Sequence, residues 1–150
     1  QRRAAWCTSR GESVVVSAPT SSGKTAVAEC AIHIALAKRR SVIFCSPIKA
    51  LSNEKFLDFS VKFPGRVGLL TGDAAVPPSR DILVATTEVL RSILFRGEPL
   101  DKVLIVVFDE LHFLGNKDRG NVWEETIILL PAHINIVGLS ATIPNCLDLA

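Results

Sequence analysis

Short apolar segments alternate with longer amphipathic segments along the whole chain. Six runs rich in Val and Ile favour strands, at Ser13–Ser17, Ser41–Ser46, Val67–Leu70, Ile82–Ala85, Val103–Asp109 and Ile134–Leu139. Four stretches between them have helical spacing, at Lys24–Arg39, Ala50–Phe63, Glu88–Arg96 and Asn121–Leu130. Several of these strands are apolar throughout, as strands buried on both faces of a sheet are. The alternation predicts one α/β domain, with a mainly parallel sheet and helices on both of its faces.

The composition is that of one ordinary globular domain. The 150 residues are 48% hydrophobic and 21% charged, which excludes a disordered tail, a collagen-like repeat and a disulfide-dense miniprotein. The longest apolar run, Val103–Phe108, is far shorter than the ~20 residues that span a bilayer, so we expect no membrane association. Lys and Arg number 17 against 15 Asp and Glu, so any contact with nucleic acid must come from a local surface.

The cysteines indicate a reducing compartment. Cys7, Cys30, Cys45 and Cys146 show no C-x-x-C spacing, and no histidines complete a zinc pattern with them. We interpret them as reduced thiols and expect an intracellular protein of the nucleus or the cytoplasm.

The segment Ser17–Thr25 has the pattern of a phosphate-binding loop. It follows an apolar strand and opens a helix, whose first N–H groups form a cradle for anions. We expect Lys24 to reach the β- and γ-phosphates of ATP and the Thr25 hydroxyl to hold Mg²⁺. Ala18 replaces the first glycine of the usual pattern, so Gly23 carries more weight against the alternative of an ordinary strand–turn–helix junction. The residues expected to contact the nucleotide are Ala18, Pro19, Thr20, Ser21, Ser22, Gly23, Lys24 and Thr25.

Two acidic residues follow the apolar strand that ends at Phe108. Asp109 and Glu110 stand at its carboxyl end, where open α/β sheets bind ligands. With a phosphate loop in the same chain, Asp109 would hold Mg²⁺, partly through water, and Glu110 would polarise the attacking water. His112 would lie on the γ-phosphate side, so we assign catalytic roles to Lys24, Asp109, Glu110 and His112. An isolated Asp-Glu pair is also a common helix cap, which is the alternative interpretation.

Together with further segments, these motifs resemble a known family. Asp109–His112 resembles the DExH box, Ser140–Thr142 the S-A-T motif, and Ser46–Leu51 motif Ia of superfamily-two helicases. Essentially the whole chain resembles the first RecA-like, ATP-binding lobe of these enzymes. The strings S-P-I-K-A-L-S-N and L-S-A-T-I-P-N, with the segment Asp118–Pro131, are similar to the Superkiller and exosome-cofactor class of RNA helicases.

The resemblance implies a RecA-like P-loop NTPase fold with ATP and Mg²⁺ as cofactors. It implies ATP-dependent 3′-to-5′ unwinding or translocation of RNA, in exosome-linked processing or decay. Gln1 would contact the adenine, and Ser140 and Thr142 would couple hydrolysis to strand movement. Six residues would contact phosphates and sugars of single-stranded RNA without reading its sequence, namely Pro47, Lys49, Thr71, Gly72, Thr86 and Thr87.

The resemblance also implies parts that this sequence does not contain. Family members carry a second RecA-like lobe that supplies arginines to the γ-phosphate, and an arginine finger is worth ~10³–10⁵-fold in rate. The chain begins at Gln1 and has no Met, so we expect residues 1–150 to be a fragment of a longer protein, inactive without that lobe. Further expected partners are exosome-associated proteins.

Three other interpretations of the sequence stay open. A DNA-directed superfamily-two helicase would share nearly the same first lobe. A small-molecule P-loop kinase, or another P-loop phosphotransferase, would have no use for the S-A-T motif. A nucleotide-gated scaffold without catalysis is disfavoured because Lys24, Thr25, Asp109 and Glu110 are all intact.

Overall fold

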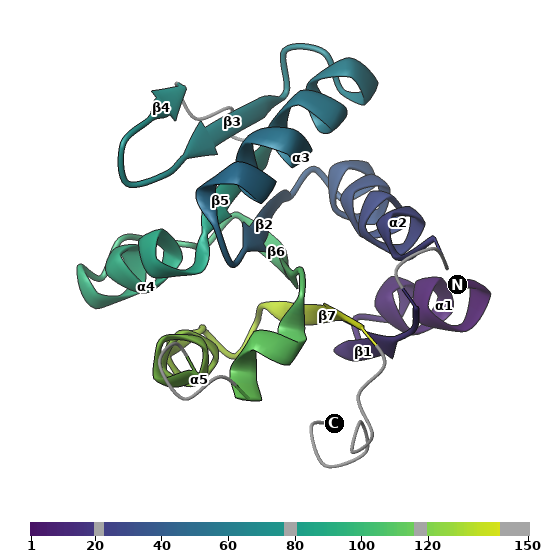
Figure 1. Cartoon of the computed structure of the whole chain (residues 1–150). Helices are drawn as coiled ribbons and strands as arrows, with labels where there is room; N and C mark the ends of the chain where they lie inside the picture. Colours follow the sequence, from purple (N-terminus) through teal and green to yellow (C-terminus); the bar gives the residue numbers. More distant parts are fainter. Residues whose placement is uncertain (20–22, 77–80, 116–119, 142–150) are drawn as a thin grey trace.

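A parallel sheet forms the centre of the molecule (Figure 1). The computed structural model describes residues 1–19, 23–76, 81–115 and 120–141. Within these ranges seven strands lie in the order β1-β7-β6-β2-β5-β3-β4. Their bounds are β1 Val14–Ser17, β2 Ser41–Ser46, β3 Val67–Leu70, β4 Ala75–Val76, β5 Ile82–Thr86, β6 Val103–Phe108 and β7 Asn135–Ser140. Strand β4 pairs antiparallel with β3 and the other pairs are parallel, which confirms the predicted sheet type.

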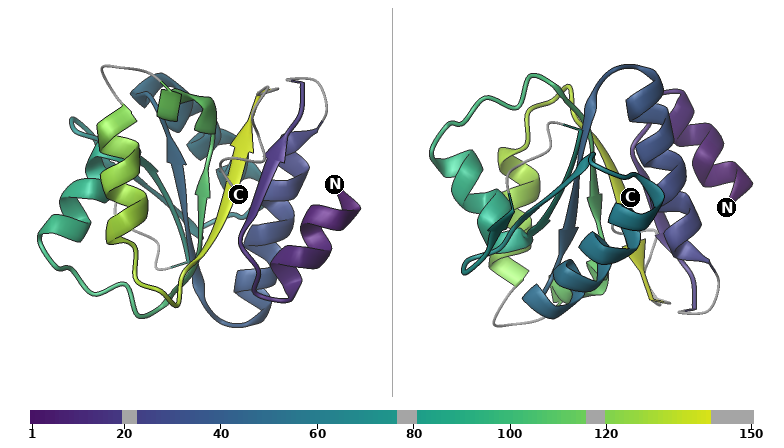
Figure 2. Two further views of the ribbon diagram at one scale, coloured as in Figure 1. Left: turned by 90° about the horizontal axis from the view of Figure 1, so that it is seen from below. Right: turned by 90° about the horizontal axis from the view of Figure 1, so that it is seen from above.

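Helices cover both faces of this sheet (Figure 2). One face carries α1 Arg2–Ser9, α2 Lys24–Ala37 and α3 Lys49–Lys62. The other face carries α4 Thr87–Phe95, the 3-10 turn η2 Leu111–Gly115 and α5 Gly120–Leu129. In the described ranges, no helix has the length and apolar character needed to cross a membrane.

Alternate residues of the central strands build two separate cores. On β2, Phe44 points toward α3, where its ring meets that of Phe59 edge-on at a centroid distance of 5.1 Å. On β6, Phe108 points to the opposite face and lies 5.6 Å from Trp123 of α5. This alternation follows from the two-residue period of a strand. It explains why the central strands are apolar at every position.

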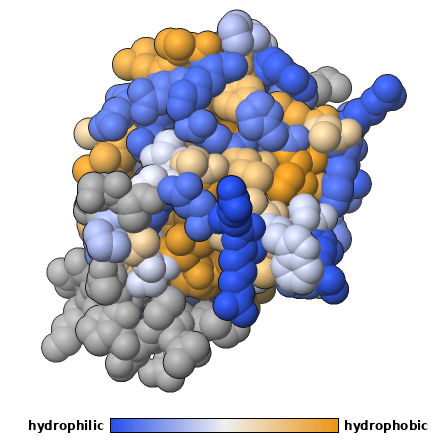
Figure 3. Space-filling model, turned by 90° about the vertical axis from the view of Figure 1, so that its right-hand side faces the viewer, coloured by the Kyte–Doolittle hydropathy of each residue, from blue (hydrophilic) through white to orange (hydrophobic). Residues whose placement is uncertain are grey.

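Three short elements differ from the sequence-based prediction. Helix α1 was not predicted because it buries only Ala4 and Thr8, too narrow an apolar face to give a pattern. Figure 3 views the molecule from the side on which α1 lies in Figure 1, and hydrophilic and hydrophobic residues are intermixed on that face. Strand β4 is only two residues long, and η2 is a single 3-10 turn. Helix α2 ends two residues earlier than predicted because Arg39 has a left-handed φ of 54°.

The connections place the predicted motifs at one edge of the sheet. Helices α2, α3 and α4 each begin after the carboxyl end of a strand, β1, β2 and β5 respectively, and η2 follows β6. Because parallel strands all point the same way, these carboxyl ends share one edge. That edge is where open α/β sheets bind ligands.

The packing of α3 yields a stability prediction. Phe59→Ala removes a fully buried ring from the contact between α3 and β2, and should lower the free energy of unfolding of the 150-residue chain by about 3–5 kcal/mol. The control is Leu57→Ala on the same helix, where the side chain is 64% exposed and the expected change is within about 0.5 kcal/mol. Urea titration followed by circular dichroism measures both. Equal losses in the two variants would contradict the described orientation of α3.

Candidate functional site

The predicted phosphate loop joins β1 to α2. Gly23 caps α2 with a φ of 76°, a left-handed conformation that glycine adopts without steric cost. The Gln1 side-chain amide donates to the Gly23 carbonyl oxygen at 3.4 Å, and a Cβ at position 23 would clash with that amide. Gln1 therefore lies against the loop. Thr20, Ser21 and Ser22 lie outside the described residues.

Lys24 is the first residue of α2, and its side chain reaches back to Ala18, directly after β1. The Lys24 side chain is buried, and its ammonium donates a hydrogen bond to the Ala18 carbonyl oxygen at 2.7 Å. Thr25 follows in the first turn and is half-buried. The N-terminus of a helix attracts anions through its dipole and its first N–H groups, so this junction can bind phosphate.

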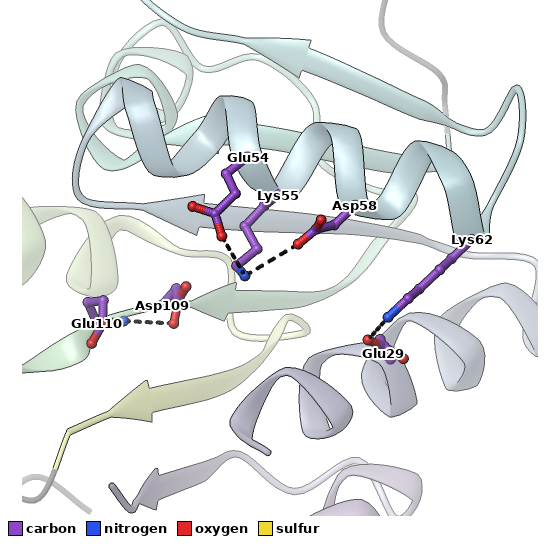
Figure 4. Close-up of polar contacts among 7 residues, drawn as sticks. All are labelled: Glu29, Glu54, Lys55, Asp58, Lys62, Asp109 and Glu110. Carbon is purple, nitrogen blue, oxygen red and sulfur yellow. Dashed lines mark hydrogen bonds and ion pairs between the residues drawn. The ribbon is translucent and has the colours of Figure 1, made fainter. Parts of the chain in front are cut away.

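The acidic pair directly follows β6 (Figure 4). The Asp109 N–H donates to the Cys45 carbonyl oxygen at 2.8 Å, which extends the pairing of β6 with β2 by one residue. Its carboxylate accepts the Glu110 N–H at 3.1 Å. Glu110 has a left-handed φ of 55°, a conformation that costs a non-glycine residue ~1–3 kcal/mol. This strained turn directs the Glu110 carboxylate toward His112, whose Nδ1 lies 3.3 Å from Glu110 Oε2.

The electrostatics of Asp109 suit a bound cation. Burial raises the pKa of the Asp109 carboxyl above its ordinary value, and the nearby charge of Glu110 raises it further. Three groups lower the pKa of Asp109 and so oppose this rise: the charge of Lys55, the hydrogen bond from the Glu110 N–H and the charge of Lys24. A cation between the carboxylates and a phosphate would relieve the same repulsion. The Asp109 carboxylate and the Thr25 hydroxyl are oxygen donors of the kind Mg²⁺ prefers, so these residues fit that ion.

The S-A-T segment is bonded directly to the strand that enters the phosphate loop. Ser140 ends β7 and pairs with Ser17 of β1. The Ala18 N–H donates to the Ser140 carbonyl oxygen at 3.1 Å, and the Ser17 hydroxyl donates to the Ala141 carbonyl oxygen at 3.3 Å. The buried Ser140 hydroxyl has no hydrogen-bond partner among the described residues. Thr142 lies outside them.

Strand β7 also contacts the turn that contains Asp109–His112, which we call the DExH turn. Gly138 lies beneath Leu111 of η2, and a Cβ at position 138 would stand 2.6 Å from Leu111 Cδ2. Glycine therefore allows the turn that holds Glu110 to pack close to β7. Because β7 also pairs with β1, it is the common neighbour of the strand that enters the phosphate loop and of the turn that follows the acidic pair.

A cavity of about 480 Å³ opens between the beginnings of α3 and α4. Four of the six residues predicted to contact RNA line it, namely Pro47, Lys49, Gly72 and Thr86. The other lining residues are Ile48, Ala50, Glu88 and Val89. We refer to it as the α3–α4 groove. The ammonium of Lys49 forms an ion pair with Asp73.

The other two predicted RNA contacts do not line the groove. The Thr71 hydroxyl accepts the Ala74 N–H at 3.2 Å and closes a tight turn. The Thr87 hydroxyl is buried and donates to the Ser46 carbonyl oxygen at 3.5 Å. Both hydroxyls already form a hydrogen bond within the chain, and their contact with RNA stays a prediction.

Sequence reasoning did not identify Lys55 as part of this edge. Glu88, the third residue of the Thr86–Glu88 segment that resembles a nucleic-acid-facing motif, lines the groove. Lys55 lies on α3, and its charge acts on Asp109. A usable signal was the position of Lys55 one turn before the buried Phe59, on the face of α3 that packs against the sheet.

Comparison with a solved structure confirms the fold. The crystal structure of the DUF1998 helicase MrfA bound to DNA and AMPPNP superposes with a TM-score of 0.76, covering 96% of this chain and 24% of that one. The two sequences are 21% identical, so this likeness concerns the fold alone.

Comparison with known sequences identifies the family. The chain is 52% identical over 151 residues to the exosome RNA helicase MTR4 of human and of mouse, covering all of this chain and 14% of each relative. It is 49% identical over 152 residues to the antiviral helicase SKI2 of Saccharomyces cerevisiae, of which it spans 12%. The family model described as DEAD/DEAH box helicase matches residues 1–149. The chain therefore belongs to the DEAD/DEAH box helicase family.

Proposed function

We propose that this chain is the ATP-binding lobe of an ATP-dependent RNA helicase that moves 3′-to-5′ along RNA in exosome-linked processing or decay. The observation that carries the proposal is the meeting of the phosphate loop, the acidic pair and the α3–α4 groove at one sheet edge. Two similar relatives, the human exosome RNA helicase MTR4 and the ATP-dependent RNA helicase mtr4 of Schizosaccharomyces pombe, are named RNA helicases, which supports RNA as the substrate. The chain spans only a small part of those proteins, so it would act as one lobe of a longer protein.

Each residue of the site has a separate part in hydrolysis. Lys24 leaves the Ala18 carbonyl oxygen and contacts the β- and γ-phosphates. Thr25 and Asp109 would hold Mg²⁺, which would supply positive charge to neutralise the phosphates. Glu110 polarises the attacking water, and its left-handed backbone and the nearby His112 fix the direction of its carboxylate. Gln1, beside Gly23, is placed to contact the adenine.

RNA would lie along the α3–α4 groove. Contacts from backbone groups, hydroxyls and one ammonium, that of Lys49, grip the sugar–phosphate backbone without regard to base sequence. Further partners are a second RecA-like lobe of the same protein and exosome-associated proteins. The protein would act inside the cell, in the nucleus or the cytoplasm, in keeping with the free thiols of Cys7, Cys30 and Cys45.

A DNA-directed helicase is the second candidate. The structure of MrfA contains DNA, but at 21% identity that likeness extends only to the fold. Relatives near 50% identity are named RNA helicases, which favours RNA. A different P-loop phosphotransferase is disfavoured because it would not use the bonds from β1 to the S-A-T segment.

The substrate can be tested on the full-length protein. Single-stranded RNA should stimulate ATP hydrolysis, and single-stranded DNA of the same sequence should stimulate it less. Phosphate release with RNA, with DNA and with neither measures this. Stimulation by DNA alone would favour the second candidate, and no stimulation by either would contradict helicase function.

The roles of Lys24 and Glu110 can be separated by substitution in the same protein. Glu110→Gln should retain nucleotide binding and lower turnover at least ~100-fold, because it removes the base but no ground-state phosphate contact. Lys24→Ala should weaken nucleotide binding itself. Calorimetry with ADP and Mg²⁺ and steady-state hydrolysis measure the two effects. The exposed Glu124, substituted by Gln, is the control. Equal turnover by Glu110→Gln and the unsubstituted protein would refute the assignment.

The two-lobe proposal predicts the behaviour of residues 1–150 alone. The chain should bind Mg²⁺–nucleotide weakly, since only one wall of the cleft is present. It should hydrolyse ATP at a negligible rate that RNA does not change, because arginines from the second lobe would be missing. Calorimetric titration and phosphate release with and without RNA test this. RNA-stimulated turnover by the isolated chain would contradict the two-lobe account.

A further inference from the structure

Helix α3 connects the α3–α4 groove to the acidic pair. Ile48 caps this helix, and Lys49 and Ala50 begin it, so the groove is lined by the first turn of α3. Lys55 follows on the same helix, and its side chain is only 15% exposed. A largely covered lysine side chain, on a helix whose other charged side chains are exposed, requires an explanation.

Register places Lys55 over the carboxyl end of β2. The rings of Phe59 and Phe44 fix where α3 crosses this strand. Helix α3 runs in the opposite direction to β2. A residue one turn before Phe59 on α3 therefore lies closer than Phe59 to the carboxyl end of β2. Ser46, two residues after Phe44, lies at that same end of β2. Lys55 is four residues before Phe59, on the same helix face. Figure 4 shows its side chain directed away from α3 toward the sheet edge.

Asp109 occupies the neighbouring position on β6. Cys45 of β2 pairs with Phe108 of β6, so Ser46 and Asp109 come next in the same register. Their side chains point to the α3 face of the sheet, since Phe44 two residues before Ser46 does so and strands alternate. The Ser46 hydroxyl is fully buried and has no hydrogen-bond partner among the described residues. Two polar groups, Ser46 and Lys55, therefore lie beside this carboxylate.

The Lys55 ammonium is held loosely between acidic groups. Its Nζ lies 3.8 Å from Glu54 Oε1 and 3.7 Å from Asp58 Oδ2, both longer than a direct hydrogen bond. Burial raises the pKa of Asp109, and Lys55 is the charge that opposes this rise most strongly, ahead of Lys24. A movement of the ammonium toward Asp109 would therefore break no short contact with Glu54 or Asp58.

We propose that Lys55 is a positioning residue through which RNA in the α3–α4 groove acts on Asp109. A small movement of α3 when RNA binds shifts the ammonium toward or away from the carboxylate, and so alters the site that holds Mg²⁺ and nucleotide. By reciprocity, nucleotide must then change the affinity for RNA by the same factor. The inference rests on the proposed function, since it needs RNA in the groove.

The test measures this coupling by binding in the full-length protein. The Kd of a single-stranded RNA is measured by fluorescence anisotropy with and without a non-hydrolysable ATP analogue and Mg²⁺. The unsubstituted protein should show a Kd ratio of about tenfold. Lys55→Met should bring the ratio close to one, while the Kd without nucleotide changes by less than about twofold. Lys55→Arg, which keeps the charge, should restore the ratio.

Lys62→Met is the matched control. Lys62 lies later on α3, is half-exposed, and forms an ion pair with Glu29 of α2 rather than with the acidic pair (Figure 4). Its variant should keep the full ratio. Unfolding temperatures identify any general loss of stability, and Lys55→Gln replaces Lys55→Met if that variant does not fold.

Each result decides the inference. An unchanged ratio in Lys55→Met, or an equal loss in Lys62→Met, would overturn it. A ratio near one in the unsubstituted protein would overturn it while leaving the proposed function intact, provided that RNA still stimulates hydrolysis. A protein that binds no RNA would refute the proposed function and the inference with it.

Discussion

The parallel pairing of β1 with β7 and of β6 with β2 determines where the polar groups of the site lie. Parallel strands cannot be joined by tight hairpins. Each connection therefore leaves from the carboxyl end of one strand and returns along a face of the sheet to the amino end of the next. Ser17 and Ser140 end neighbouring strands, and so do Ser46 and Phe108. The phosphate loop, the S-A-T segment, the DExH turn and α3 all start from these four strand ends. A change in either pairing would separate groups that are far apart in sequence.

The polar edge depends on apolar cores behind it. Asp109, Lys24 and Ser140 are buried, and burying charged or hydroxyl groups is unfavourable unless the surroundings compensate. Backbone bonds supply part of the compensation, as between Lys24 and the Ala18 carbonyl oxygen. The rest comes from two packed layers on opposite faces of the sheet, which hold the strand ends fixed. The strained turn at Glu110 persists for the same reason.

The sequence allowed the parallel sheet and the main motifs to be predicted because both leave strong local signals. Fully apolar strands such as Val103–Phe108 are buried on both faces, and Gly23 next to Lys24 marks the loop. Lys55 gave only a weak signal, its spacing of one turn before Phe59, which is easily overlooked because a lysine on a helix is ordinarily exposed. Its position depends on the contact of Phe59 with Phe44, which only the tertiary structure fixes. The left-handed backbone of Glu110 was equally hidden, since that conformation is usual for glycine.

The ion pair between Lys49 and Asp73 has a consequence for the electrolyte dependence of nucleic-acid binding. Lys49 lines the α3–α4 groove, yet its ammonium already has a carboxylate partner at the surface. A phosphate that takes this ammonium must displace Asp73 and leave that carboxylate to the solvent. The exchange replaces one ion pair by another, so this contact releases fewer net counterions than a free lysine would. If RNA binds in this groove as proposed, its affinity should therefore fall less steeply with added salt than the number of cationic contacts would suggest.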